Sequence, residues 1–239
     1  MRYKLVATDV DGVVKPYYDP VPREIAELLR EISEYCSIVF LSGRQVTWLE
    51  GLIYGMGLRP DNIVLVGEEG SVIYYPKNHR MEFPFNKIEL ERFSGIRNKL
   101  KNQIEDKFGG RVFIPCTNVI LTIAAEELFD RVNKYVLDFL KKNDAEGLCR
   151  IIYHRMHNVI QVFPSSIDKY VALRMILREN NVQEEEIIAL GDGLNDIPIL
   201  ERAGVSIAVG ENKEVKKVAK KHFLDPKDAF EYVLSLVKH

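Results

Sequence analysis

The fold is decided by the stretch YKLVATDVDG, residues 3–12 of this 239-residue chain. Its apolar part is short and partly β-branched, which predicts a buried strand rather than a helix. Residues two apart in a strand share a face, with Cα atoms about 6.5 Å apart. Asp9 and Asp11 should therefore point the same way at the carboxyl end of the strand, where α/β sheets place their chemistry.

Two carboxylates held this close repel each other, so they require a cation, a shared proton, or both. An aspartate after a first strand can also cap the sheet or the next helix. A calcium-binding EF-hand loop does not fit, because Gly12 falls too early and Pro20 occupies the place of the last acidic ligand. Polar motifs at the ends of other expected strands favour a functional interpretation of the two aspartates.

Composition limits the class of protein. The net charge of −2 provides no basic field for nucleic acid, and no apolar stretch approaches the roughly 20 residues of a membrane helix. Cys36, Cys116 and Cys149 are odd in number and lack metal-ligand spacing, so we expect reduced core thiols. The chain runs into its first strand without room for a signal peptide, which predicts a cytoplasmic protein.

Strand and helix patterns alternate at both ends of the chain. This alternation predicts an α/β fold with a doubly wound, Rossmann-like parallel sheet. The expected strands are 3–8, 37–41, 62–66, 187–190, 205–209 and a short one near 222–224; the expected helices are 22–34, 45–56, 168–180, a segment ending at 203, and two beginning at 212 and 226.

The middle of the chain has a different pattern. A helix over 87–107 precedes a hairpin of 111–114 and 119–124, and a helix over 126–142 precedes a hairpin of 150–153 and 158–163. This αββαββ order predicts an open antiparallel sheet with helices on one face. We therefore expect a core domain of residues 1–80 and 166–239, with an inserted α+β cap domain of residues 81–165.

A second acidic motif, Gly191-Asp192-Gly193-Leu194-Asn195-Asp196, follows an apolar strand. Such a polar, glycine-rich segment packs poorly and binds ions well. Asp192 would complete an all-oxygen site with Asp9 and the backbone carbonyl of Asp11, a donor set that suits Mg²⁺. Asn195 or Asp196 can alternatively cap the next helix.

Two further positions fit a phosphate site. Ser42, Gly43 and Arg44 end the second strand and begin a helix, where a hydroxyl and free amides form a phosphate cradle. A serine in this place is also a common helix cap. Lys169 lies at the start of the helix after the insertion, where a lysine is either solvated surface or a cation facing phosphate.

Together these motifs resemble the haloacid dehalogenase superfamily of phosphatases, in order and spacing, over nearly the whole chain. The four motifs are residues 9–12, Ser42, Lys169 and residues 191–196. The insertion resembles the C2B cap of the Cof-type branch, which includes archaeal phosphoglycolate phosphatases, mannosyl-3-phosphoglycerate phosphatase, sucrose and trehalose phosphate phosphatases, and phosphomannomutases. Residues 67–71 resemble that branch's Glu-Asn-Gly element, with Glu69 in the place of the Asn.

The chain departs from the family pattern at two other positions. Val13 replaces the usual Thr after the first motif, and Tyr170 replaces the Gly that usually follows the motif lysine. The change to Val13 is common among relatives in the family, so we expect activity to survive it, and the motif lysine itself is kept before Tyr170. The added ring of Tyr170 affects substrate fit more than the chemistry.

The resemblance implies a Mg²⁺-dependent phosphatase in which Asp9 attacks phosphorus and forms an aspartyl-phosphate. Asp11 would protonate the leaving alkoxide and then deprotonate the attacking water. The family assigns phosphate or substrate binding to Gly12, Ser42, Gly43, Arg44, Lys169 and Asn195, and metal binding to Asp9, Asp11 and Asp192, with Asp196 behind them orienting a metal-bound water and Lys169. The partner would be a small phosphorylated metabolite, and the protein a monomer or homodimer.

The substrate and three rival functions stay open at this point. Phosphoglycolate, a mannosyl-3-phosphoglycerate and simple sugar phosphates all fit. The polar cap residues that we expect to contact substrate are Arg111, Thr122, Arg150, His154 and Gln161. The rivals are a sugar-phosphate mutase resembling phosphomannomutase, a phosphoacceptor receiver domain, and a non-catalytic phosphate-binding relative; the insertion and the second acid two residues after the first disfavour a receiver.

Overall fold

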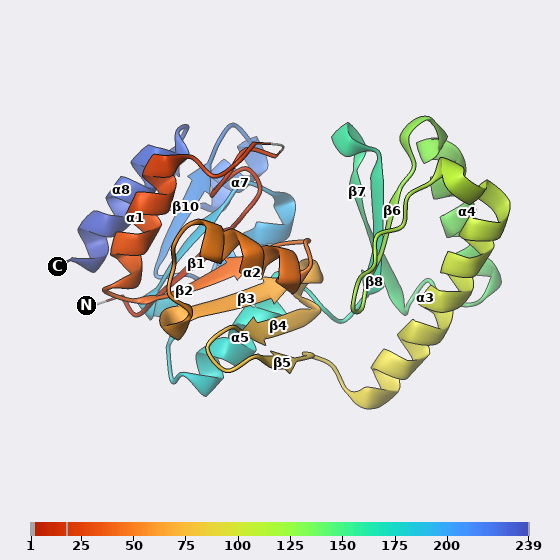
Figure 1. Cartoon of the computed structure of the whole chain (residues 1–239), viewed down its shortest axis with the longest axis horizontal. Coiled ribbons are helices and arrows are strands. Elements are labelled where there is room, and N and C mark those ends of the chain that lie inside the picture. The colour runs from red at the N-terminus through yellow and green to blue at the C-terminus, as the bar shows by residue number, and fades with distance from the viewer. Residues whose placement is uncertain (1–2, 18, 239) are drawn as a thin grey trace. The chain divides into compact units, whose positions relative to one another are not determined.

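The computed structural model describes residues 3–17 and 19–238. The chain divides into two compact units, Met1–Pro84 with Asp168–His239, and Phe85–Ile167. We call the first the core unit and the second the inserted unit (Figure 1).

The core unit is built on one sheet. Its strands are β1 (Leu5–Asp9), β2 (Ser37–Leu41), β3 (Ile63–Gly67), β4 (Val72–Tyr75), β5 (Arg80–Glu82), β9 (Ile187–Gly191), β10 (Val205–Val209) and β11 (Lys221–Phe223). Among the described residues they lie in the order β11-β10-β9-β1-β2-β3-β4-β5. The pairs from β11 to β3 are parallel, and β4 and β5 add an antiparallel edge. The predicted α/β fold is confirmed.

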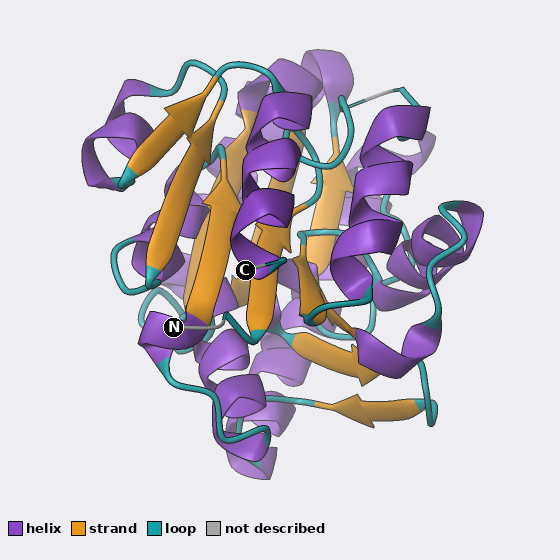
Figure 2. Ribbon diagram, turned by 90° about the vertical axis from the view of Figure 1, so that its left-hand side faces the viewer, coloured by secondary structure: helices purple, strands orange, loops and turns teal. Residues whose placement is uncertain are grey.

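Helices cover both sides of this sheet (Figure 2). They are α1 (Arg23–Ser33), α2 (Val46–Gly55), α5 (Lys169–Glu179), α6 (Ile197–Leu200), α7 (Lys213–Val218) and α8 (Pro226–Val237). Helices α5, α6 and α7 share a buried apolar cluster with Leu5 and Ala7 of β1. Helices α1 and α8 contact each other, and Val6, between those two β1 residues, is also fully buried. Because β1 is apolar on both faces, it lies at the centre of the layers.

The antiparallel edge was not predicted. After β3 the chain turns through a short 3-10 segment, Glu68–Gly70, and returns as β4, with Gly67 paired to Val72. Both Glu68 and Glu69 have positive φ, 53° and 57°. Glutamate rarely adopts this left-handed conformation, so these two residues give no sequence signal for a turn.

The inserted unit contains two helices and a small sheet within the part of the chain that the structure describes. The helices are α3 (Lys87–Phe108) and α4 (Phe129–Lys142), and the strands are β6 (Leu121–Ala124), β7 (Cys149–His154) and β8 (Val159–Pro164). The strands are antiparallel, in the order β6-β8-β7. The α4 face that carries Val132, Val136 and Phe139 is buried, as its helical spacing requires.

One strand predicted for the insertion is wrong. Residues 111–114 form a single antiparallel bridge, between Phe113 and Ala124, rather than a strand of the sheet. The Phe113 side chain is 68% exposed, so no buried face holds this segment in register. Pro115, which has no N–H to donate, follows directly and limits further pairing.

The cysteines correct another expectation. Cys36 and Cys149 are buried, but Cys116 is exposed and is not a core thiol. Within residues 3–17 and 19–238, no helix has the length and apolar character to span a membrane.

Candidate active site

The carboxyl ends of β9, β1 and β2 meet at one edge of the core sheet. Thr8 pairs with Leu190 and Asp9 with Leu41, so Asp192, Asp9 and Ser42 follow one another along that edge. The chain adds β2 and β3 on one side of β1 and β9 to β11 on the other. Such a reversal of strand order opens a crevice in which doubly wound proteins bind ligands.

Lys169 joins the acids of this edge. Its side chain is 1% exposed and forms ion pairs with Asp9 and, at 2.7 Å, with Asp196. Helix α5 begins at this residue because the Asp168 carboxylate caps it, accepting from the amide of Val171 at 2.7 Å. The alternative of a solvated surface lysine is therefore wrong.

Asp9, Asp192 and Asp196 bring one carboxylate oxygen each within 4.8 Å of one another. Three ionised carboxylates carry three negative charges, of which Lys169 offsets one. The remaining two charges and the all-oxygen donor set fit a divalent hard cation such as Mg²⁺. Asp11 was expected at the metal through its backbone carbonyl, which this group of side-chain oxygens does not include, so that assignment stays a prediction.

The loop after β9 is shaped by Asp196 and by close packing. One Asp196 oxygen accepts from the amides of Asp192 and Gly193, at 3.2 and 3.0 Å. A Cβ on Gly191 would lie 2.5 Å from the Cβ of Asp196. A Cβ on Gly12, whose φ is +91°, would lie 2.2 Å from a carboxylate oxygen of Asp192. Both motif glycines thus let the acids approach the backbone.

The crowding of charge shifts the pKa values of the cluster. Burial, with repulsion from Asp196 and Asp192, raises the pKa of Asp9 well above its usual value, although Lys169 opposes the shift. Burial and repulsion from Asp196 raise the pKa of Asp192 to about 7. Burial by itself lowers the pKa of Lys169, but Asp196, Asp9 and Glu69 outweigh it and raise that pKa well above the usual value. The lysine stays charged, and the acids favour a cation.

Asp11 has different surroundings. Strand β1 ends at Asp9, so Asp11 lies in the following loop and not on a shared strand face as expected. Its carboxylate accepts from Arg44 at 2.6 and 2.8 Å and from Lys15 at 3.1 Å. The Arg44 guanidinium also lies 4.2 Å from the ring centre of Trp48. Arg44 thus forms an ion pair with Asp11, and its expected contact with phosphate stays a prediction.

The phosphate cradle is partly as expected. Ser42 is 2% exposed, and its hydroxyl oxygen accepts from the amide of Arg44 at 3.1 Å, which leaves the hydroxyl hydrogen to donate. Gly43 lies between these two residues and is partly buried. The amide of Gly12 donates to the carbonyl of Lys15 at 2.7 Å. Contrary to expectation, this conformation does not offer that amide to a phosphate.

Sequence reasoning gave too little weight to the Glu68–Gly70 turn. Glu68 and Glu69 are 0% and 3% exposed. A Cβ on Gly70, whose φ is +96°, would lie 2.2 Å from the carbonyl oxygen of Asp168, so the turn packs against the residue that caps α5. The Asn195 amide donates to Glu69 at 3.0 Å. The departure of Glu69 from the family pattern was the available signal.

The inserted unit brings together only some of its expected substrate residues. Gln161 pairs with Thr122 across β8 and β6, and its side chain lies 3.5 Å from the Thr122 hydroxyl and 2.9 Å from His154. Arg150 donates to the carbonyl of Ile167 and lies over Phe163. Arg111 donates to the carbonyl of Phe108. The two arginines are thus occupied elsewhere.

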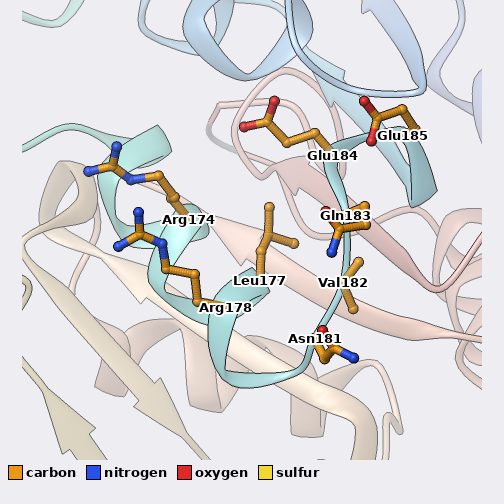
Figure 3. A pocket seen from close by; sticks show the side chains of 8 residues that line it. All are labelled: Arg174, Leu177, Arg178, Asn181, Val182, Gln183, Glu184 and Glu185. Carbon is orange, nitrogen blue, oxygen red and sulfur yellow. The ribbon is translucent and has the colours of Figure 1, made fainter.

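A pocket of about 470 Å³ lies away from the acids, at the end of α5 and in the segment before β9 (Figure 3). Its lining includes Arg174, Arg178, Glu184 and Glu185. Because Asp192 follows β9 and this pocket precedes it, the two occupy opposite ends of that strand.

The fold and the acidic edge define an α/β enzyme with a candidate cation and phosphate site. Residues 85–229 match the model of the haloacid dehalogenase-like hydrolase family. Because the match covers more than half of the chain, the protein belongs to this family. The resemblance inferred from the four motifs is confirmed.

Relatives across nearly the whole length agree. The chain is 24% identical to a phosphoglycolate phosphatase of Nitrosopumilus maritimus, over 92% of this chain and 89% of that protein. It is 28% identical to a 5-amino-6-(5-phospho-D-ribitylamino)uracil phosphatase of Bacillus subtilis, over 93% and 90%. The fold matches a haloacid dehalogenase-like hydrolase of Bacteroides thetaiotaomicron with TM-score 0.76 at 20% identity, over 97% of this chain and 100% of that one. Family and relatives together support a phosphatase.

Proposed function

We propose that this protein is a Mg²⁺-dependent phosphatase that hydrolyses a small phosphate monoester through a phosphoryl group held on Asp9. The observation that carries the proposal is the buried Asp9 carboxylate, paired with Lys169 and grouped with Asp192 and Asp196. A nucleophile, a fixed cation and a metal-type oxygen cluster thus meet at the carboxyl edge of the sheet. The names of the phosphatase relatives support the same reaction.

In the proposed reaction an Asp9 oxygen forms a bond to phosphorus while the ester P–O bond breaks. Asp11 gives a proton to the departing alkoxide and then takes one from the water that hydrolyses the acyl phosphate. Lys169 neutralises charge as the anionic nucleophile meets the anionic phosphate. The Ser42 hydroxyl is placed to donate to a phosphoryl oxygen.

Asp9 and Asp192 would hold the metal, and Asp196 would hold Lys169 and the loop of Asp192 in place. When bound, Mg²⁺ supplies positive charge to the phosphoryl oxygens and neutralises the two charges that Lys169 leaves.

The substrate class is also a proposal. We propose that residues 1–80 and 166–239 carry the chemistry and that the cap of residues 81–165 selects the leaving group. The Thr122, Gln161 and His154 side chains offer it hydrogen-bonding groups, which suits the carboxylate or hydroxyls of a small metabolite. Phosphoglycolate is the first candidate, because relatives of similar length bear that name.

The test measures phosphate release from 2-phosphoglycolate, glycerol 3-phosphate, glucose 6-phosphate and p-nitrophenyl phosphate, with Mg²⁺ or with EDTA. Acid quenching during turnover, followed by peptide mass spectrometry, should find the phosphoryl group on the peptide that contains Asp9. Full activity in EDTA, or a phosphoryl group on another residue, would contradict the proposal.

A further inference from the structure

Lys15 is a buried cation that the proposed reaction does not yet use. Its side chain is only 6% exposed, although it lies in the loop after β1. A buried ammonium is costly unless its hydrogens are all bonded. Its contacts therefore indicate what it stabilises.

Those contacts tie one carboxylate to one piece of backbone. The Lys15 ammonium donates to Asp11 at 3.1 Å, to the carbonyl of Tyr17 at 2.8 Å, and to the carbonyl of Pro16. The loop itself is closed by two backbone bonds, from Gly12 to the Lys15 carbonyl at 2.7 Å and from the Lys15 amide to Val10 at 3.0 Å. The three hydrogens of the ammonium are thus all directed at Asp11 and the Pro16–Tyr17 segment.

Asp11 depends on such contacts because it lies beyond the ladder of β1. Two cations hold its carboxylate from different elements: Arg44 from the end of β2, and Lys15 from its own loop. Arg44 is itself placed by Trp48, 4.2 Å from its guanidinium carbon. The position of the Asp11 oxygens is therefore set by side chains rather than by the sheet.

The segment that Lys15 binds carries Tyr17 close to the acidic cluster. Burial raises the pKa of Tyr17, and the charges of Asp192 and Asp9 raise it further. Lys15 holds this segment and Asp11 as one unit.

We propose that Lys15 is a positioning residue that fixes the proton-transferring carboxylate of Asp11 and the Pro16–Tyr17 segment relative to each other. This inference rests on the proposed function, because Asp11 needs a fixed position only if it protonates a leaving group. Losing the ammonium leaves Asp11 on Arg44 alone, releases the Pro16 carbonyl, and leaves the Tyr17 carbonyl with only a long contact to Arg44, at 3.5 Å. The variant should therefore lose more activity on substrates with an alkoxide leaving group, which needs a proton, than on p-nitrophenyl phosphate, whose leaving group needs none.

The experiment compares kcat/KM for p-nitrophenyl phosphate with that for the best alkyl phosphate of the panel, at pH 7 with Mg²⁺. This constant covers the reaction only up to departure of the leaving group, so later hydrolysis of the acyl phosphate does not enter. Lys15→Met should lower the alkyl phosphate value by about 10- to 100-fold and the p-nitrophenyl phosphate value by less than about threefold. We call the ratio of these two losses the split; Asp11→Asn, which removes the proton donor itself, gives its upper bound.

Lys227→Met is the matched control, since Lys227 also pairs with an acid four residues away, Glu231, but is exposed; it should change neither value. Lys15→Gln keeps hydrogen-bond donors for the carbonyls but not the charge, and its split should be smaller than that of Lys15→Met. Equal losses on both substrates, unchanged values, or failure of both Lys15 variants to fold would overturn the proposal. A wild-type protein that hydrolyses no phosphate ester overturns the proposed function instead.

Discussion

Asp9 and Asp11 stand two residues apart, yet they lie in opposite electrostatic surroundings. Asp9 ends a strand and is buried with two other carboxylates and one ammonium. Asp11 lies in a loop, where Arg44 and Lys15 both donate to it. The comparison teaches that the sheet places the first acid in a site short of positive charge, while side chains supply cations to the second.

The largest expected effect is the loss of activity when Asp9, the first of the two acids, is replaced. Asp9→Asn removes the proposed nucleophile and should lower kcat by on the order of 10⁴-fold or more, as loss of a nucleophile does elsewhere. Steady-state phosphate release measures this. Asp61→Asn is the control, because Asp61 is exposed and pairs only weakly with Lys77 at 3.6 Å. An Asp9→Asn protein of near wild-type activity would give the role of nucleophile to another residue.

The next effect tests how closely the backbone just after Asp11 approaches Asp192. Gly12→Ala must place a Cβ where a carboxylate oxygen of Asp192 lies, at φ +91°, a strain of order 1–3 kcal/mol. We expect kcat to fall by about 10- to 100-fold and the Mg²⁺ concentration for half-maximal activity to rise. Gly51→Ala is the control, since no atom lies within 4 Å of its Cβ. Equal metal requirements in both variants would argue against the Asp192 contact.

The shortage of positive charge around Asp9 predicts a pH-dependent response to metal. The pKa of Asp192 is about 7 in the folded protein, and that of Asp9 is also raised. The metal-free folded state therefore binds more protons than the unfolded chain between about pH 4 and 7, and its stability falls as pH rises through that window.

Mg²⁺ binds the ionised acids, so its stabilising effect should grow over the same window. We expect saturating Mg²⁺ to raise Tm by about 5 °C at pH 8 and to have little effect at pH 5, measured against EDTA. Asp192→Asn should remove most of the effect at pH 8. A Tm increase of equal size at both pH values would show that these acids do not bind the metal.

The site residues also differ in how far they could be predicted from the sequence. Asp9 ends a strand, Asp192 directly follows one, and Lys169 begins a helix of a parallel α/β pattern, so topology alone brings them to one edge. Lys15 carried no pattern, because an isolated lysine in a loop has no periodicity. The role proposed for it rests on the contacts of its ammonium with Asp11 and with the carbonyls of Pro16 and Tyr17, which only the folded structure reveals.

The fold shows the same division. The parallel strands were predictable as apolar runs between amphipathic helices, but β4 and β5 were not. Their antiparallel return depends on two successive glutamates with positive φ, Glu68 and Glu69, a conformation held by burial in the core unit rather than by residue preference. In the inserted unit, the failed strand at 111–114 looked apolar but has no buried face to pack on.

The smallest expected effect concerns the stability of the metal-free protein, and it compares the loss of Asp11 with the loss of Asp9. Asp11→Asn removes the partner of two cations and should lower the free energy of unfolding by about 1 kcal/mol, or Tm by roughly 2–4 °C, since Arg44 is partly exposed and water screens it. Asp9→Asn removes a carboxylate whose ionised form is costly, while Lys169 keeps Asp196 at 2.7 Å. We therefore expect no loss of Tm for Asp9→Asn in EDTA at pH 8. Thermal unfolding of both variants decides the point: if Asp9→Asn is the less stable protein, its pairing with Lys169 outweighs the repulsion around it, and the two acids differ in position alone.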